Sequence, residues 1–141
     1  MLKSGALLLV GPCADNRIGL PEPLPPGVAV FEYASYAAVF PRASAIVHQG
    51  GVGTTAQALR AGIPSLIVPF NFDQPGNAAR VARVGAACVV PRNAYTAKRA
   101  ATMLRALVSD EQIIRRSRTS ASEIASEHGS EAECDAIEQI L

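Results

Sequence analysis

Short, unbroken apolar runs recur along the chain, and each is closed by glycine, proline or a polar residue. Apolar runs of about four to eight residues are typical of strands that are buried on both faces of a parallel sheet. The runs predict strands at residues 6–10, 28–33, 45–48, 65–69 and 87–90.

Segments rich in helix-forming residues alternate with these runs. Gly62 and Gly85 follow two such segments and are typical helix C-terminal residues, while Pro41 is expected to stop a short helical turn. The pattern predicts helices at residues 36–40, 54–61, from within 73–77 to about 84, 96–108, 110–128 and, after a break near 129–130, to 141.

The alternation of short apolar strands and helices indicates βαβ units. The predicted fold class is therefore α/β, with a Rossmann-like parallel sheet and helices on both faces, in a single domain over residues 1–141 whose C-terminal helices occupy about 96–141. Ligands of such sheets bind beyond the carboxyl ends of the strands. The loops after His48 and after Pro69 follow consecutive strands, so we expect them side by side over one crevice.

Composition narrows the class of protein. The chain has 141 residues, 49% hydrophobic and 18% charged, with a formal net charge of +1, which disfavours nucleic acid or anionic lipid as the main partner. The apolar runs are too short to span a bilayer, and we expect a cytoplasmic protein. Cys13, Cys88 and Cys134 are interpreted as incidental thiols, and His128 as a surface residue.

The segment I-V-H-Q-G-G-V-G-T-T-A-Q at 46–57 carries the chemistry of a site. Gly50, Gly51 and Gly53 bring bare backbone N–H groups to a helix start, where the partial positive charge favours a phosphate. Thr54 and Thr55 are expected to cap this helix and to offer their hydroxyls to the same anion. The alternative is a tight turn that only packs.

Two known phosphate-binding motifs were compared with this loop. No Gly-Lys-Ser/Thr follows it, so it is not a P-loop. Gly51, Gly53 and Ala56 match G-x-G-x-x-A, but the acid Asp73 lies in a loop past Pro69 and not at a strand tip. A fragment of a dinucleotide-binding dehydrogenase is therefore the least favoured of three hypotheses for the function of this chain.

The two loops together resemble a known family. H-Q-G-G-V-G-T-T-A-Q-A-L-R-A-G-I-P at 48–64, a strand, and then P-F-N-F-D-Q-P-G-N-A-A-R-V at 69–81 resemble the donor-binding segment of UDP-glycosyltransferases. These are the GT-B enzymes of glycosyltransferase family 1 and their bacterial macrolide-type relatives. The resemblance implies the C-terminal, nucleotide-sugar-binding half of such an enzyme.

The resemblance assigns roles residue by residue. The family's diphosphate-binding histidine falls on Gln49, directly before the glycine pair, and its ribose-binding acid falls on Gln57; both are departures from the family pattern, although each amide can still form hydrogen bonds. The family's base-stacking tryptophan has no counterpart, since the chain has none, and Tyr33 or Phe31 is the nearest aromatic residue. The implied substrate-binding set is Tyr33, His48, Gln49, Gly50, Gly51, Gly53, Thr54, Thr55, Gln57, Asp73 and Gln74.

Structural interpretations stay open for single residues of this set. In the family, the pair matched by Asp73 and Gln74 contacts sugar hydroxyls, whereas Asp73 taken alone suits a helix N-cap ahead of Pro75. Gln57 suits an exposed helix position. His48 suits a histidine at the edge of the core, because Gln49 holds the family's histidine position.

The resemblance also implies a reaction. In the family, a histidine of the N-terminal domain deprotonates an acceptor hydroxyl, which attacks the sugar with inversion, and no metal or other cofactor takes part. We expect a UDP- or dTDP-hexose as donor, no catalytic residue in this chain, and inactivity without an N-terminal acceptor domain or partner chain. The alternative is a non-catalytic nucleotide-sugar-binding subunit of a two-chain glycosyltransferase.

One β-α unit of the family domain has no counterpart before residue 6. From this we expect an uncovered sheet edge, which invites pairing with another chain or a second copy of this one.

Overall fold

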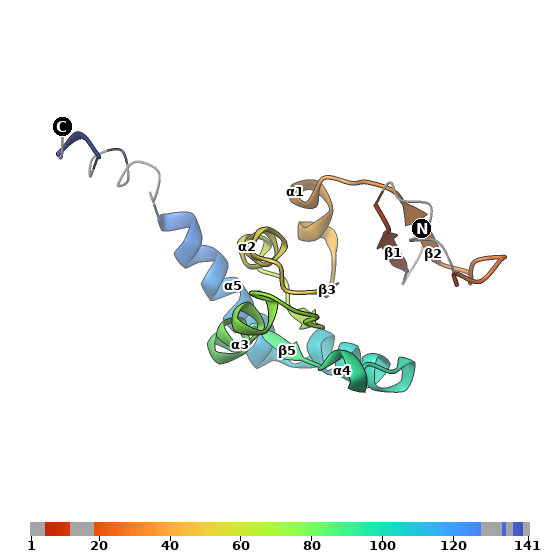
Figure 1. Cartoon of the computed structure of the whole chain (residues 1–141). Coiled ribbons are helices and arrows are strands. Elements are labelled where there is room, and N and C mark those ends of the chain that lie inside the picture. Colours follow the sequence, from red (N-terminus) through yellow and green to blue (C-terminus); the bar gives the residue numbers. More distant parts are fainter. Residues whose placement is uncertain (1–4, 12–18, 128–133, 135–136, 140–141) are drawn as a thin grey trace. The chain divides into compact units, whose positions relative to one another are not determined.

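The computed structural model describes residues 5–11, 19–127, 134 and 137–139 (Figure 1). The chain divides into two compact units, Met1–Val39 and Phe40–Leu141, and each is described by itself. Cys13, His128 and the expected helix break at 129–130 lie outside the described residues, as does most of the expected last helix. The assignment of 1–141 to a single domain stays a prediction.

The first unit contains a parallel pair of short strands. β1 (Ala6–Leu9) pairs with β2 (Val28–Phe31) in the register Ala6↔Val28. The helix α1 (Tyr36–Val39) follows. The expected end of this helix before Pro41 is confirmed, because α1 ends at Val39 and Pro41 lies in the 3-10 turn η2 (Phe40–Arg42) that follows in the chain.

The second unit is built on a three-stranded parallel sheet. Its order is β3-β4-β5, formed by β3 (Ile46–His48), β4 (Ser65–Ile67) and β5 (Ala87–Val89). The predicted α/β class with parallel strands is confirmed, but the described strands form two sheets instead of one. As predicted, β3 and β4 are neighbours, so the loops that follow them leave the same edge of the sheet.

Helices cover both faces of this sheet. Leu66 and Ile67, adjacent on the central strand β4, are fully buried and belong to opposite clusters. Leu66 packs with Ala100 and Leu107 of α4 (Ala97–Ser109), and Ile67 packs with Ala78 and Val81 of α3 (Gln74–Val84). α2 (Val52–Ala61) contacts α5 (Glu111–Ser126), which also contacts α4.

The predicted helix ends are largely confirmed. Gly62 and Gly85 end α2 and α3 in the left-handed conformation, at φ 68° and 82°. Asp110 caps α5 through its side chain, which accepts hydrogen bonds from the N–H groups of Gln112 and Ile113. Cys88 is half-buried against the α4 cluster, and this burial raises the pKa of its thiol.

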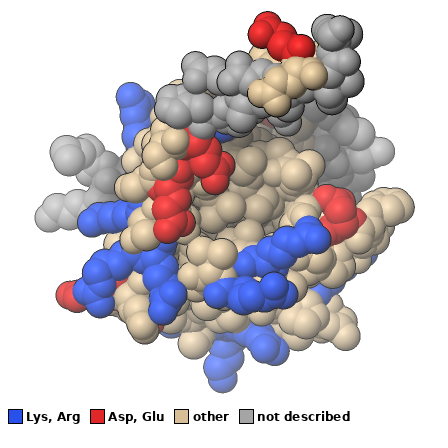
Figure 2. Space-filling model, turned by 90° about the vertical axis from the view of Figure 1, so that its left-hand side faces the viewer, with Lys and Arg blue, Asp and Glu red and all other residues tan. Residues whose placement is uncertain are grey.

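The charged surface of the second unit is mixed. On the face in Figure 2, basic side chains are spread out with acidic side chains among them. On α5, Arg115 forms an exposed ion pair with Glu111 at 3.2 Å, which agrees with a solvated helix face. Within the described part of the chain, no helix is long and apolar enough to cross a membrane.

Candidate functional site

The turn from β3 into α2 differs from the expected one. The helix begins at Val52, with Gly51 as its N-cap and no side-chain capping bond, so the prediction that Thr54 and Thr55 cap it is wrong. The physical reason is that the carbonyl of Gly51 already accepts the N–H of Thr55 at 2.9 Å, which closes the first turn earlier. The N–H groups of Val52, Gly53 and Thr54 therefore have no acceptor within the helix, and such a helix start is a type of site that suits anions.

Gly50 joins this turn to the rest of the unit. Its φ is +92°, and a Cβ placed on it would lie 3.0 Å from Cγ2 of Ile67 and 3.2 Å from the carbonyl oxygen of Gln74. Only glycine adopts this conformation without strain and allows such an approach. The residue therefore holds the end of β3 directly against β4 and the first residue of α3.

Gly53 has no such packing role. It is exposed in the first turn of α2, and a Cβ placed on it would meet nothing within 4 Å. A glycine inside a helix costs about 0.5–1 kcal/mol relative to alanine. Because packing does not require this glycine, its bare backbone is consistent with the close approach of a ligand.

Gln49 lies at the same helix start. Its side chain is exposed, and its Nε2 would be 3.2 Å from a Cβ placed on Gly51, the N-cap residue. The amide can therefore add a side-chain donor to the backbone N–H groups of α2. Thr54 is half-buried in the same first turn.

His48 is a buried, neutral histidine. It is 9% exposed, its Nδ1 accepts the N–H of Gly50 at 3.1 Å, and desolvation by burial lowers its pKa from 6.5 to about 4. The proton of the neutral ring then lies on Nε2, which is buried with no hydrogen-bond partner in the described structure, as is Oγ1 of Thr55. The interpretation as a core-edge histidine agrees with this burial and with the bond at Nδ1.

The second predicted loop is tied to the first by hydrogen bonds. Nδ2 of Asn77 donates to the carbonyl of Gly50 at 3.0 Å and to the carboxylate of Asp73 at 2.7 Å. Asp73 is the N-cap residue of α3, yet its side chain makes no capping bond and is exposed. Its carboxylate is thereby held beside the glycine turn.

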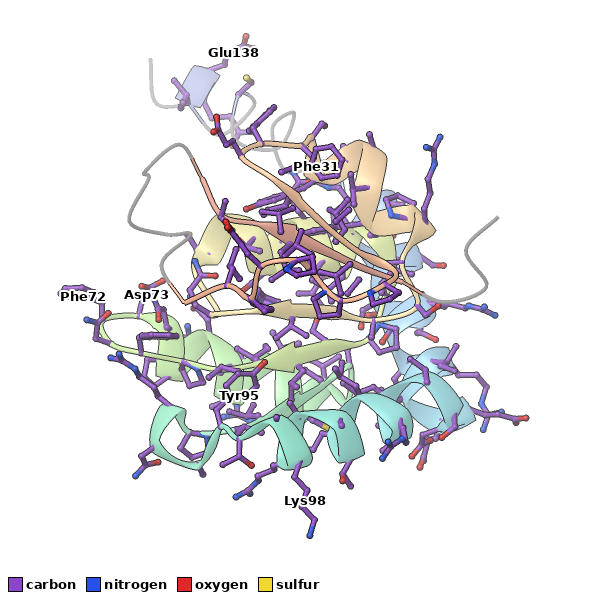
Figure 3. All side chains as sticks on the ribbon, turned by 90° about the vertical axis from the view of Figure 1, so that its right-hand side faces the viewer. Phe31, Phe72, Asp73, Tyr95, Lys98 and Glu138 are labelled. Carbon is purple, nitrogen blue, oxygen red and sulfur yellow. The ribbon has the colours of Figure 1, made fainter. Side chains whose placement is uncertain are left out.

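Gln74 stabilises its own loop. Its Oε1 accepts the N–H groups of Phe70 at 2.9 Å and of Asn71 at 3.5 Å, so its amide nitrogen is the group left to contact a ligand. Phe72, which stands between Asn71 and Asp73 in this loop, is 90% exposed and adopts a φ of 55°, which is rare for an aromatic residue. Figure 3 shows Phe72 and Asp73 at the outer end of this loop.

Gln57 and Tyr33 complete the predicted set. Gln57 is half-buried in the second turn of α2. Tyr33 belongs to the first unit, and its side chain is 83% exposed. Phe31 of β2, in the same unit, is 48% exposed. Among the described residues, no group of three or more His, Cys, Asp or Glu side chains could hold a metal ion.

Sequence reasoning missed two features. One is Asn77, four residues after Asp73 and thus on the same helix face, a spacing that could have indicated it. The other is the contribution of Arg92 and Tyr95, after β5, to the crevice at the carboxyl ends of the strands, where the structure has a cavity of about 430 Å³. Arg92 stands over one of its walls, with the guanidinium carbon 4.6 Å from the ring centre of Phe70. The cavity is lined by Val47, His48, Gln49, Val68, Phe70, Arg92 and Tyr95.

Comparisons with known proteins find related sequences over most of the chain. The family model described as "Erythromycin biosynthesis protein CIII-like, C-terminal domain" matches residues 13–140. The O-mycaminosyltylonolide 6-deoxyallosyltransferase of Streptomyces fradiae is 40% identical over 124 residues, which are 86% of this chain and 29% of that protein. The chain thus spans less than a third of that relative.

Solved structures show the same fold. The glycotransferase of kitacinnamycin aligns with a TM-score of 0.88 at 29% identity, covering 97% of this chain and 35% of that one. The glycosyltransferase VinC, solved in complex with dTDP, aligns with a TM-score of 0.77 at 29% identity, covering 89% of this chain and 31% of that one. Both likenesses are to the matching third of a larger glycosyltransferase.

The contrast between Gly50 and Gly53 predicts opposite effects of one substitution. Gly50→Ala should destabilise the fold by about 2 kcal/mol, through left-handed strain and displacement of Ile67. Gly53→Ala should stabilise it by up to about 1 kcal/mol. Urea unfolding of both variants beside the unmodified chain measures the two effects, and changes of the same sign would contradict the geometry.

Burial of His48 predicts an acid-dependent loss of stability. With a folded-state pKa of about 4 and an unfolded-state value of 6.5, the unfolded state binds the extra proton between these values. Stability should be complete above about pH 6.5 and fall as the pH decreases toward 4, by up to about 1.4 kcal/mol per pH unit. His48→Asn keeps an acceptor for the N–H of Gly50 but does not titrate.

The measurement is urea unfolding of both proteins across this pH range. Carboxylates contribute to the pH dependence of each protein, so the difference between the two isolates His48. Parallel pH profiles would show that the folded protein does not hold His48 neutral.

Proposed function

The chain belongs to the family of erythromycin biosynthesis protein CIII-like C-terminal domains, which are the C-terminal domains of macrolide-type GT-B glycosyltransferases, and from this membership we propose that it binds the donor of an inverting hexosyl transfer. The proposed donor is a UDP- or dTDP-hexose, and the proposed acceptor group is a hydroxyl. Catalysis would require an N-terminal acceptor domain or a partner chain to supply the base.

The observation that carries this proposal is the start of α2. The N–H groups of Val52, Gly53 and Thr54 lack helical acceptors, Gly53 is open to solvent without a packing reason, and the Gln49 amide lies beside Gly51. A diphosphate needs donors of this kind, and the helix start adds about half a positive charge. In the proposed reaction, these donors would stabilise the charge that develops on the leaving diphosphate.

The other predicted residues have places in the same proposal. Asp73 and the free amide nitrogen of Gln74 would contact hydroxyls of the hexose, and Gln57 would contact the ribose. Neutral His48 would hold the turn through Gly50 and would not pair with the diphosphate as a cation. The likeness to VinC, which was solved with dTDP, supports a dTDP- or UDP-linked donor.

Calorimetric titration of the chain with dTDP, UDP and NAD tests the proposed function. We expect binding of at least one of the two nucleoside diphosphates and weaker or no binding of NAD. Gly53→Ala should weaken binding of the diphosphate about tenfold while its fold stays intact, because the added methyl group would hold the phosphate away from the N–H groups at the start of α2. Binding of NAD alone would refute the glycosyltransferase proposal and favour the dehydrogenase hypothesis.

Asp73 provides a second test, because its proposed contact is to the sugar. Asp73→Ala should weaken binding of dTDP-glucose or UDP-glucose by more than it weakens the corresponding nucleoside diphosphate, since only the former has hexose hydroxyls. Asp73→Asn, which keeps an acceptor for the amide of Asn77, controls for loosening of the loop. Equal losses for sugar-linked and free nucleotides would contradict the role given to Asp73.

A further inference from the structure

Two wall residues of the cavity at the strand ends lie on the other face of the sheet from the glycine turn. Val47 pairs in register with Leu66, which packs toward α4, and Val68 follows Leu66 by two residues, so both valines point to the α4 face. Gly50 instead lies against Ile67, which packs toward α3. The cavity and the start of α2 are therefore neighbouring surfaces that share His48 and Gln49, because His48 lines the cavity and accepts the N–H of Gly50.

The lining of the cavity defines the chemistry of its ligand. Its apolar walls are open to solvent, with Val47 45%, Phe70 53% and Tyr95 43% exposed. The charged group at the cavity is Arg92, held over the Phe70 ring at 4.6 Å, and no carboxylate is among the lining residues. A volume of about 430 Å³ is in the range of small-molecule sites. These walls suit an apolar, ring-containing molecule with oxygen acceptors.

A hydrogen bond connects one wall of the cavity to the loop that carries the proposed sugar-binding residues. The N–H of Phe70, a wall residue, donates to the Oε1 of Gln74 at 2.9 Å, so Phe70 and the pair Asp73–Gln74 belong to one hydrogen-bonded loop. In Figure 3, Asp73 lies at the end of this loop and Tyr95 on the segment that leads into α4. A molecule in the cavity would thus lie beside a hexose held by Asp73 and Gln74.

We infer that this cavity holds the apolar body of the acceptor, so that the chain contributes to acceptor choice as well as donor binding. The inference rests on the proposed function, because in a glycosyl transfer the acceptor oxygen must come within about 3–3.5 Å of the reacting sugar carbon. The cavity shares the loop from Phe70 to Gln74 with the proposed sugar-binding residues, so an acceptor held in it would lie near the transferred hexose. Arg92 and the hydroxyl of Tyr95 would donate hydrogen bonds to acceptor oxygens.

The inference is tested on the whole chain by nuclear magnetic resonance, with O-mycaminosyltylonolide and estradiol as neutral ring-containing probes. At probe concentrations up to about 1 mM, we expect shifts of the amide signals of Val47, Val68, Phe70, Arg92 and Tyr95 with at least one probe. Phe70→Ala and Tyr95→Ala should each weaken that probe about fivefold or more. Shifts confined to other residues, or none with either probe, would overturn the inference.

Controls separate this inference from the proposed donor site. Val84→Ala, at the far end of α3 and with a similarly exposed side chain, should leave probe binding unchanged. Tyr95→Phe keeps the ring, so it should retain most of the binding lost in Tyr95→Ala. Affinity for dTDP should change less than twofold in Phe70→Ala and Tyr95→Ala, and a parallel loss of dTDP would assign the cavity to the nucleotide and overturn the inference. If the unmodified chain binds neither dTDP nor UDP, the proposed function fails, whatever the probe data show.

Discussion

The close approach at Gly50 is the constraint on which the site depends. Its left-handed backbone places the end of β3 against Ile67 of β4 and against the first residue of α3. The side-chain amide of Asn77 donates hydrogen bonds to both the Gly50 carbonyl and the Asp73 carboxylate. One glycine and one amide therefore set the position of the start of α2 relative to the loop that carries Asp73 and Gln74.

The same turn determines which groups can attract a phosphate. Burial keeps His48 neutral and uses its Nδ1 to accept the N–H of Gly50, so its ring supports the turn and supplies no charge. Attraction of an anion is then left to the backbone N–H groups of α2 and the Gln49 amide, together with the helix dipole. Such groups need no proton uptake, so their strength does not depend on pH near neutrality.

Under the proposed function, the two neighbouring surfaces of the second unit would serve a single glycosyl transfer. The start of α2 is polar and suits the diphosphate, whereas the cavity beside Phe70 and Tyr95 is apolar and suits an acceptor. The loop from Phe70 to Gln74 borders both surfaces, and the Gln74 side chain holds it in shape. A rigid loop between donor and acceptor would allow one binding event to orient the other without a change in this unit.

Local sequence determined the parallel α/β class, the helix ends at Gly62 and Gly85, and the two loops at one sheet edge, because periodicity and glycine conformation act over a few residues. It could not reveal that the N-cap of α2 is Gly51 and not a threonine, since that depends on which carbonyl accepts the N–H of Thr55. Nor could it separate Gly50, required for packing, from Gly53, which is open to solvent. The neutrality of His48, the bridge made by Asn77 and the cavity between strand ends were decided only by the tertiary structure. Desolvation and contacts between residues distant in sequence exist only once the strands and helices have packed together.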